Sequence, residues 1–353
     1  MTDLDKPHLF READPQNMLA RISELPQQCR EAWTNAQSLP LPAGYHQAQA
    51  VVILGMGGSA IGGDLLRTLL ESECPVPITV SRDYTVPAFV NERTLAIASS
   101  YSGNTEETLA ACEAARQAGA MLLAITTGGK LATWAQKWNV PLLSFDYRAT
   151  PRAALGHSIV PLLGIVGRLG LVSDKTADLD EAIAVMKSWQ QEINEAVPLT
   201  ENAAKQLAVK LYQHLPVIYG AGHLSEVARR WKGQFNENAK AWAFFEQLPE
   251  MNHNALAGTE FPANLAREIV VVMLTSSMDH PRTRMRFQIT QELLSQRGVS
   301  CEVVEARGSS RLAQMLSAVH FGDYVSFYLA MLYDVNPTAL QAVDYLKQRL
   351  AEM

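Results

Sequence analysis

Two short stretches of the sequence carry the residue types that hold a phosphate group. The first is GMGGSAIGG, residues 55–63, which includes Gly57, Gly58 and Ser59. Glycine lets the backbone come close to a ligand and adopt positive φ, so a strand that enters a helix through such a turn directs free amides at an anion. This stretch by itself also fits a dinucleotide-binding turn, because it matches G-x-G-x-x-A and Asp83 stands at the end of the next strand-like segment.

The second stretch is SSYSGNTEET, residues 99–108, in which Ser100, Ser102 and Thr105 supply hydroxyls at the start of a helix. Hydroxyls and helix N-terminal amides are what a phosphate dianion needs when no Lys or Arg is nearby. Asn104 or Thr105 is also expected to cap this helix, but capping needs only one side chain. The two stretches together therefore favour a phosphate ligand over a dinucleotide.

The segments around both stretches alternate between strand and helix. Short apolar runs predict strands at residues 50–55, 78–83, 95–100 and 121–127. Helices are expected near 61–70 and 105–119. This alternation is typical of a doubly wound parallel sheet, in which ligands bind at the carboxyl ends of the strands. Both stretches follow strands, so we expect them to meet at one edge of the sheet.

The same pattern recurs after a charged helical segment at residues 174–198. Strands are expected at 216–223, where the run again enters glycines, and at 269–277 and 301–306. Two such α/β halves suggest duplication. The predicted organisation is an N-terminal helical extension (1–42), a first α/β subdomain (43–172), a helical connector (173–200), a second α/β subdomain (201–335) and a C-terminal helix (336–353).

The composition is that of a globular protein with two domains. Of 353 residues, 48% are hydrophobic and 19% are charged, with a net charge of −6. An acidic chain without Lys/Arg runs is a poor partner for nucleic acid or for an anionic membrane surface. No apolar run reaches the roughly 20 residues of a membrane-spanning helix. Four scattered cysteines and histidines without ligand spacing predict neither a disulfide framework nor a metal site, so we expect a cytoplasmic protein.

The pair GMGGSAIGGD and SYSGNTEET resembles the sugar isomerase fold family. The further segments PRAALG from Pro151, Asn236–Asn238 and PEMNHN from Pro249, with a Leu-Lys pair near the C-terminus, make the chain similar to bifunctional phosphoglucose/phosphomannose isomerases. The resemblance spans nearly the whole chain in the same order. One departure is Ala255, where the family pattern has a glutamate.

The resemblance implies an α/β fold of two doubly wound parallel-sheet subdomains of the sugar isomerase type, with helical extensions at both ends. It implies an aldose–ketose isomerase that interconverts glucose 6-phosphate and mannose 6-phosphate with fructose 6-phosphate through a cis-enediol. The sugar phosphate would be bound between the halves, and no cofactor is expected. Relatives in this family are commonly homodimers.

The resemblance also implies four catalytic residues. Glu237 would carry the proton between C1 and C2, as a single carboxylate can. His253, with an ordinary pKa near 6.5, would open the sugar ring from the partner subunit of a homodimer. Arg152 would stabilise the charge that develops on the enediolate oxygens or orient the base. Lys347 resembles the ring-opening lysine of the family.

Two other functions are compatible with the sequence. A non-catalytic sugar-phosphate sensor would keep the hydroxyls of Ser100, Ser102 and Thr105 but would not need Glu237 and His253 together. A nicotinamide dehydrogenase would need an adenosine pocket near Asp83. Binding of NADH separates the second alternative from the isomerase.

Overall fold

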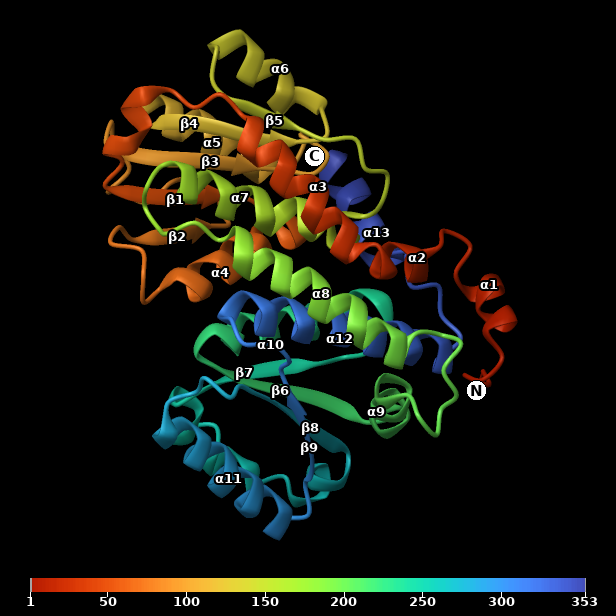
Figure 1. Ribbon diagram of the computed structural model, residues 1–353. Helices are drawn as coiled ribbons and strands as arrows, with labels where there is room; N and C mark the ends of the chain where they lie inside the picture. Colours follow the sequence, from red (N-terminus) through yellow and green to blue (C-terminus); the bar gives the residue numbers. More distant parts are fainter. Residues whose placement is uncertain (1, 353) are drawn as a thin grey trace. The chain divides into compact units, whose positions relative to one another are not determined.

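The computed structural model describes residues 2–352, and the contacts within it divide the chain into two compact units (Figure 1). The five-stranded unit comprises residues 24–187 and 307–316. The four-stranded unit comprises residues 188–306 and 317–352 together with residues 2–23. Each unit is built around one parallel sheet. The division of the chain into two extensions, two subdomains and a connector stays a prediction.

The sheet of the five-stranded unit has the order β2-β1-β3-β4-β5, with every pair parallel. The strands are β1 (Ala50–Leu54), β2 (Ile78–Ser81), β3 (Thr94–Ser99), β4 (Met121–Thr126) and β5 (Leu142–Ser144). The helices of this unit are α3 (Leu25–Ser38), α4 (Gly57–Leu70), α5 (Glu106–Gln117), α6 (Gly129–Trp138) and α7 (Gly156–Arg168), with most of α8 (Thr176–Ile193). From β1 the chain goes to β2 at one edge of the sheet, and then to β3, β4 and β5 on the other side of β1. This is the doubly wound topology predicted from the sequence.

Alternation along the central strands explains how both faces of this sheet are covered. Val52 and Leu54 of β1 pack in one apolar cluster with residues of α5 and α6. Ile53, which points to the opposite face, lies against Gly63 of α4. The strands are therefore buried on both faces, and this is why they appear in the sequence as continuous apolar runs.

The sheet of the four-stranded unit has the order β7-β6-β8-β9, again with every pair parallel. Its strands are β6 (Leu215–Ala221), β7 (Phe244–Leu248), β8 (Ile269–Thr275) and β9 (Ser300–Glu305). Its helices are α1 (Phe10–Ala13), α2 (Met18–Ser23), α9 (Ala203–Leu211), α10 (Ser225–Asn238), α11 (Pro281–Gln296) and α13 (Gln341–Ala351), with most of α12 (Arg311–Leu332). Figure 1 shows α10 and α12 on one face of this sheet and α11 on the other. The strand order corresponds to β2-β1-β3-β4 of the first sheet, which agrees with two halves of one architecture.

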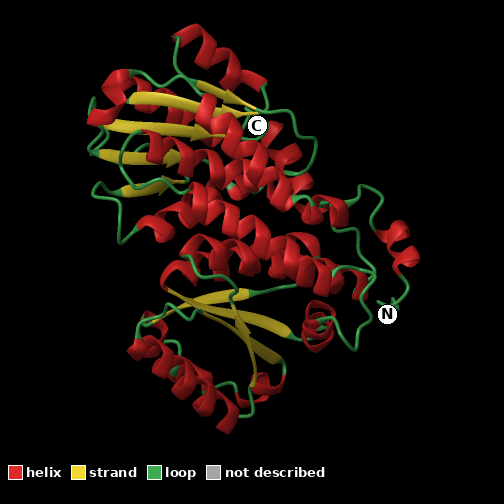
Figure 2. Cartoon of the chain, viewed as in Figure 1, coloured by secondary structure: helices red, strands yellow, loops and turns green. Residues whose placement is uncertain are grey.

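Figure 2 shows the helices and strands of the chain by colour. Strands β5 and β7 and helices α6, α7, α9 and α12 had no counterpart in the sequence prediction. β5 has only three residues, and β7 is a half-exposed edge strand. α12 is buried almost all round, so it lacks the polar face that gives an amphipathic helix its period. In the part of the chain that the structure describes, no helix is both long enough and apolar enough to cross a membrane.

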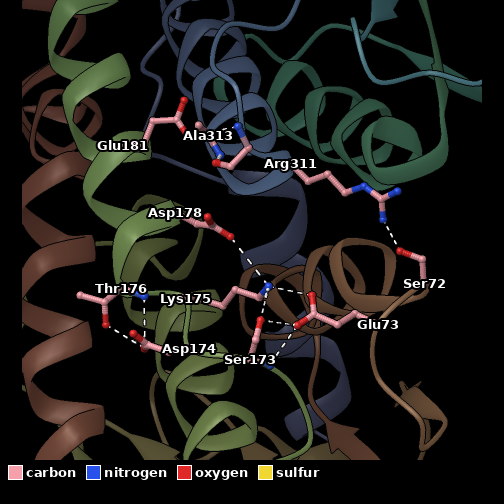
Figure 3. Close-up of polar contacts among 11 residues, drawn as sticks. Ser72, Glu73, Ser173, Asp174, Lys175, Thr176, Asp178, Glu181, Arg311 and Ala313 are labelled. Carbon is pink, nitrogen blue, oxygen red and sulfur yellow. Dashed lines mark hydrogen bonds and ion pairs between the residues drawn. The ribbon is translucent and has the colours of Figure 1, made fainter.

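The segment Arg307–Leu316 is bound to the five-stranded unit by a network of polar contacts (Figure 3). The carboxylate of Glu181 accepts hydrogen bonds from the backbone N–H groups of Ser309 at 2.6 Å and Ser310 at 3.0 Å, next to the first residue of α12. Partial burial opposes ionisation of Glu181, but these hydrogen bonds hold its pKa below the usual range. Arg311 donates to the hydroxyl of Ser72. A carboxylate at the N-terminus of α12 also interacts favourably with the helix dipole.

His320 of α12 is a buried titratable group in the four-stranded unit. Its Nε2 lies 3.0 Å from the carbonyl oxygen of Ile22, at the end of α2, and its ring is 5.2 Å from that of Tyr324. Among the described residues its Nδ1 has no hydrogen-bond partner. Burial lowers the pKa of His320 to about 4. The imidazole is therefore neutral at neutral pH and holds α2 against α12 as a hydrogen-bond donor.

This depressed pKa predicts a loss of stability in mild acid. The folded value lies below the ordinary 6.5, so the unfolded chain binds more protons between the two values and the free energy of unfolding falls as the pH decreases through that window. Between about pH 8 and pH 5 the wild type should lose about 2 kcal/mol from this group, measured by urea unfolding. His320→Gln keeps a hydrogen-bond donor but cannot ionise. Its free energy of unfolding should therefore fall by about 2 kcal/mol less than that of the wild type over the same pH range. The exposed His8→Gln is the matched control, and an equal loss in both variants would contradict the assignment.

Candidate active site

The first glycine stretch forms the turn from β1 into α4. The helix begins at Gly57, earlier than the sequence pattern indicated, and Gly57 has φ +50, a left-handed conformation that glycine adopts without strain. Among the described residues no side chain caps this end of α4. The N–H of Ser59 donates to the carbonyl oxygen of Met56 at 3.0 Å, and no described side chain caps the amides before it.

The second stretch forms the turn from β3 into α5 and is held by its own hydroxyls. Ser100 is buried, and its Oγ donates to Thr105 Oγ1 at 2.9 Å and accepts from the N–H of Gly103 at 3.1 Å. Ser102 is exposed, and its Oγ accepts from the N–H of Asn104 at 3.2 Å. The expectation of a side-chain cap is wrong, since within residues 2–352 neither Asn104 nor Thr105 accepts from the first turn of α5. These amides too are open to a ligand.

The structure brings the two turns together, as the sequence predicted. β1 and β3 are neighbours in the sheet, with Leu54 opposite Ala98, so their carboxyl ends lie side by side. The N–H of Tyr101 donates to Ser59 Oγ at 3.1 Å and joins the turns directly. β2 and β4 lie on the outer sides of this pair, which makes it the topological switch point where such sheets bind ligands.

Arg152 lies against the first turn and is buried, with 3% of its surface exposed. A Cβ on Gly58 would be 2.7 Å from the carbonyl carbon of Pro151 and 2.8 Å from the nitrogen of Arg152, so only glycine allows this approach. Ser158 Oγ donates to the carbonyl oxygen of Ser59 at 3.2 Å and fixes the segment on its other side. Three segments of one unit thus supply the predicted phosphate-binding residues and the arginine, namely Gly57, Gly58, Ser59, Ser100, Ser102, Thr105 and Arg152.

A third turn, Thr126–Lys130, supports the second and was missed from the sequence. Thr127 Oγ1 donates to the carbonyl oxygen of Tyr101 at 2.7 Å, and the N–H of Lys130 donates to Asn104 Oδ1 at 3.0 Å. The contact is made by the backbone of Lys130, whose ammonium group lies 4.8 Å from the centre of the Trp134 ring. The sequence TTGGK at the end of a predicted strand could have indicated this turn.

A small cavity of about 10 Å³ is lined by residues of the turns after β1 and β3 and of helix α7, which include Ser59, Tyr101 and His157. The ring of His157 stacks on Phe145 at 4.7 Å, and burial lowers the pKa of His157. Among the described residues its Nε2 has no hydrogen-bond partner. The cavity has about the volume that one water molecule needs. The imidazole of His157 is therefore part of the cavity lining. The sequence analysis did not identify this residue.

The other three predicted catalytic residues belong to the four-stranded unit. Glu237 is the penultimate residue of α10 and is partly buried, with its carbonyl oxygen accepting from Lys240 Nζ at 2.7 Å. His253 is exposed on a short 3-10 helix, Glu250–His253. Lys347 is exposed on α13. Their action together with the phosphate-type turns stays a prediction.

His253 is presented by a loop that its neighbours hold in place. Asn252 Nδ2 donates to Thr290 Oγ1 of α11 at 2.9 Å, and Asn254 Nδ2 donates to Glu250 Oε1 at 3.1 Å. The N–H of Ala255, at the position that departs from the family pattern, donates to Asn254 Oδ1 at 2.5 Å. The imidazole is thus exposed between two anchored asparagines. No group of His, Cys, Asp and Glu within residues 2–352 is arranged to hold a metal ion.

Known proteins share both halves of the chain. The SIS domain family matches residues 44–137, and the bacterial phospho-glucose isomerase C-terminal SIS domain matches residues 200–350. A bifunctional phosphoglucose/phosphomannose isomerase of Caldicellulosiruptor bescii is 42% identical over 95% of this chain and 99% of its own length. One of Aquifex aeolicus is 34% identical over 86% of this chain and 90% of its own. The chain belongs to the bifunctional phosphoglucose/phosphomannose isomerase family.

Solved structures agree with this family at the level of the fold. A hypothetical protein of Thermus thermophilus superimposes with a TM-score of 0.75 and 17% identity, covering 99% of this chain and 93% of its own. This likeness shows that the chain of the phosphoglucose/phosphomannose isomerase family shares its fold with that protein.

Removing the hydroxyls of the second turn should weaken phosphate binding. In the triple variant Ser100→Ala, Ser102→Ala and Thr105→Ala, each lost hydrogen bond to a charged group is worth about 1.5–3 kcal/mol. We expect the Michaelis constant for sugar phosphate and the inhibition constant of inorganic phosphate both to rise by more than about tenfold. Thr133→Ala, which removes an exposed hydroxyl from α6, is the control. An unchanged Michaelis constant in the triple variant would show that the phosphate binds elsewhere.

Proposed function

We propose that this chain is an aldose–ketose isomerase that interconverts glucose 6-phosphate and mannose 6-phosphate with fructose 6-phosphate. The observation that carries the proposal is the meeting of the β1–α4 and β3–α5 turns, with their uncapped amides and hydroxyls, in a chain that belongs to this family. The phosphate would be held by these turns. The sugar would then extend toward the residues that move protons.

The reaction needs one group to move a proton between neighbouring carbons. Glu237 would take the proton from C2 of the aldose, which gives a cis-enediol, and return it to C1, which gives the ketose. One carboxylate serves both steps because C1 and C2 are adjacent. Arg152 would stabilise the negative charge that develops on the enediolate oxygens. No redox cofactor is needed, because the oxidation of C2 and the reduction of C1 balance within one molecule.

His253 and Lys347 would open the sugar ring before isomerisation. Opening moves a proton from the C1 hydroxyl to the ring oxygen, which requires groups that donate and accept near neutral pH. Both side chains are exposed on the surface of the single chain, and His253 is held outward by its neighbouring asparagines. A group that moves protons in an active site is shielded from bulk water, so we expect another protein surface to cover His253.

We infer that a second copy of the chain covers it in a homodimer. Helix α13 leaves every residue from Gln341 to Leu350 exposed, including Tyr345 at 66%, Leu346 at 56% and Leu350 at 53%. Apolar side chains gathered in this way are typical of an interface between proteins, and most soluble oligomers are symmetric dimers. In this arrangement His253 of one subunit would complete the site of the other. The acidic composition and the scattered cysteines favour the cytoplasm for this dimer.

Glu237→Gln tests the proton transfer. The amide has nearly the same shape but cannot accept the proton, so turnover should fall by several orders of magnitude while the inhibition constant of inorganic phosphate stays within about twofold. Glu201→Gln, in an exposed loop, should keep full activity. If Glu237→Gln keeps more than about a tenth of the turnover, another residue is the base. A sugar-phosphate sensor would show binding without turnover already in the wild type.

Mixed dimers test the shared site. Glu237→Gln and His253→Ala dimers should each be inactive, but a dimer with one chain of each kind contains one site with both wild-type residues. Random pairing makes about half of the dimers mixed, and one of two sites is intact, so about a quarter of the wild-type activity should return after refolding the two variants together. Activity no greater than the sum of the two parents would mean that each site uses one chain only.

A further inference from the structure

Tyr101 occupies the centre of the second turn, and its backbone is fixed from two sides. Its N–H donates to Ser59 Oγ at 3.1 Å, and its carbonyl oxygen accepts from the N–H and Oγ1 of Thr127 at 3.1 and 2.7 Å. The residue therefore has one position relative to the turns after β1 and β4. Its side chain is not needed for any of these contacts.

The side chain of Tyr101 reaches a different segment, the connection between β5 and α7. Its hydroxyl donates to the carbonyl oxygen of Tyr147 and accepts from the N–H of Ala149 at 2.8 Å. Its ring meets that of Phe145 edge to face at 6.1 Å. One hydroxyl thus satisfies two backbone groups of a segment without regular structure, which would otherwise have to bond to water.

Arg152 lies between this contact and a second anchor. Beyond it, Gln28 of α3 donates from Nε2 to the carbonyl oxygen of Ala153 at 2.9 Å and accepts at Oε1 from the N–H of Gly156 at 3.2 Å. The backbone before Arg152 is held by Tyr101 and the backbone after it by Gln28. Since Arg152 also touches the first turn at Gly58, its position depends on both anchors.

We propose that Tyr101 is a positioning residue that links the phosphate-binding turn to Arg152. The proposal rests on the proposed function, in which Arg152 stabilises the enediolate. Tyr101 lies between Ser100 and Ser102 in the turn that would bind the phosphate, and its hydroxyl connects this turn to Tyr147 and Ala149. Arg152 is therefore held in a fixed position relative to the turn that would bind the other end of the substrate.

The variant Tyr101→Phe removes one oxygen atom and keeps the ring. We expect kcat to fall by about tenfold or more, because Arg152 loses one anchor, while the inhibition constant of inorganic phosphate changes by less than about twofold. The matched control is Tyr45→Phe. It removes a hydroxyl that also donates to a backbone carbonyl oxygen, that of Leu122 at 2.6 Å, in the same unit but not in the segment before Arg152, so its kcat should stay close to that of the wild type.

A double-mutant cycle shows whether Tyr101 acts through Arg152. In an Arg152→Ala background, Tyr101→Phe should lower kcat by less than about twofold, because the group it positions is already absent. Full additivity of the two effects would overturn the proposal, as would a rise in the phosphate inhibition constant as large as the fall in kcat. If Tyr101→Phe gives too little folded protein, Tyr101→His, which keeps a ring at shorter reach, is measured in the same way.

A crystal structure separates this proposal from the proposed function. In Tyr101→Phe crystals with inorganic phosphate, residues 147–152 should be displaced or poorly ordered relative to wild-type crystals, while Ser100 and Ser102 still contact the phosphate. An unchanged Arg152 would overturn the positioning role even if the protein is an isomerase. If the wild type does not turn over glucose 6-phosphate or mannose 6-phosphate, the proposed function fails while this structural link is still tested.

Discussion

The close approach of two backbones at Gly58 is the constraint on which the site depends. A Cβ at this position would be 2.7 Å from Pro151, so any other residue would push the Arg152 segment away from α4. The approach places a buried arginine beside a helix N-terminus that no described side chain caps. A cation beside a helix N-terminus without a side-chain cap is an arrangement that favours an anion.

The second sheet repeats the strand order of the first, but its switch point has different chemistry. The turn after β8 carries Asp279, a buried carboxylate whose Oδ2 accepts from the N–H of Ser276 at 3.0 Å. In the first sheet the corresponding turn, after β3, carries Ser100 and Ser102, and its carboxylates, Glu106 and Glu107, follow in the first turn of α5. The two halves therefore share a strand order, while the turns at their switch points carry different side chains.

Several parts of the fold could be predicted because local patterns decide them. The strands β1, β3, β4, β6 and β8 are apolar runs followed by turns rich in glycine or hydroxyl groups, since inner parallel strands are buried on both faces. The carboxyl ends of neighbouring parallel strands must lie together, so Ser59 and Ser100 could be assigned to one edge from the sequence. α12 could not be found in this way, because a helix buried all round shows no amphipathic period.

The sequence by itself determined the α/β class, the two turns, the family and the residues that carry its motifs. Only the tertiary structure showed that Arg152 is buried beside Gly58, that Thr105 bonds to Ser100 instead of capping α5, and that Tyr101 reaches Tyr147 and Ala149. The reason is physical. Strand and turn preferences act over a few residues along the chain, whereas the contacts of Arg152 and Tyr101 join segments that are far apart in the sequence. Only packing of the whole unit brings such segments together.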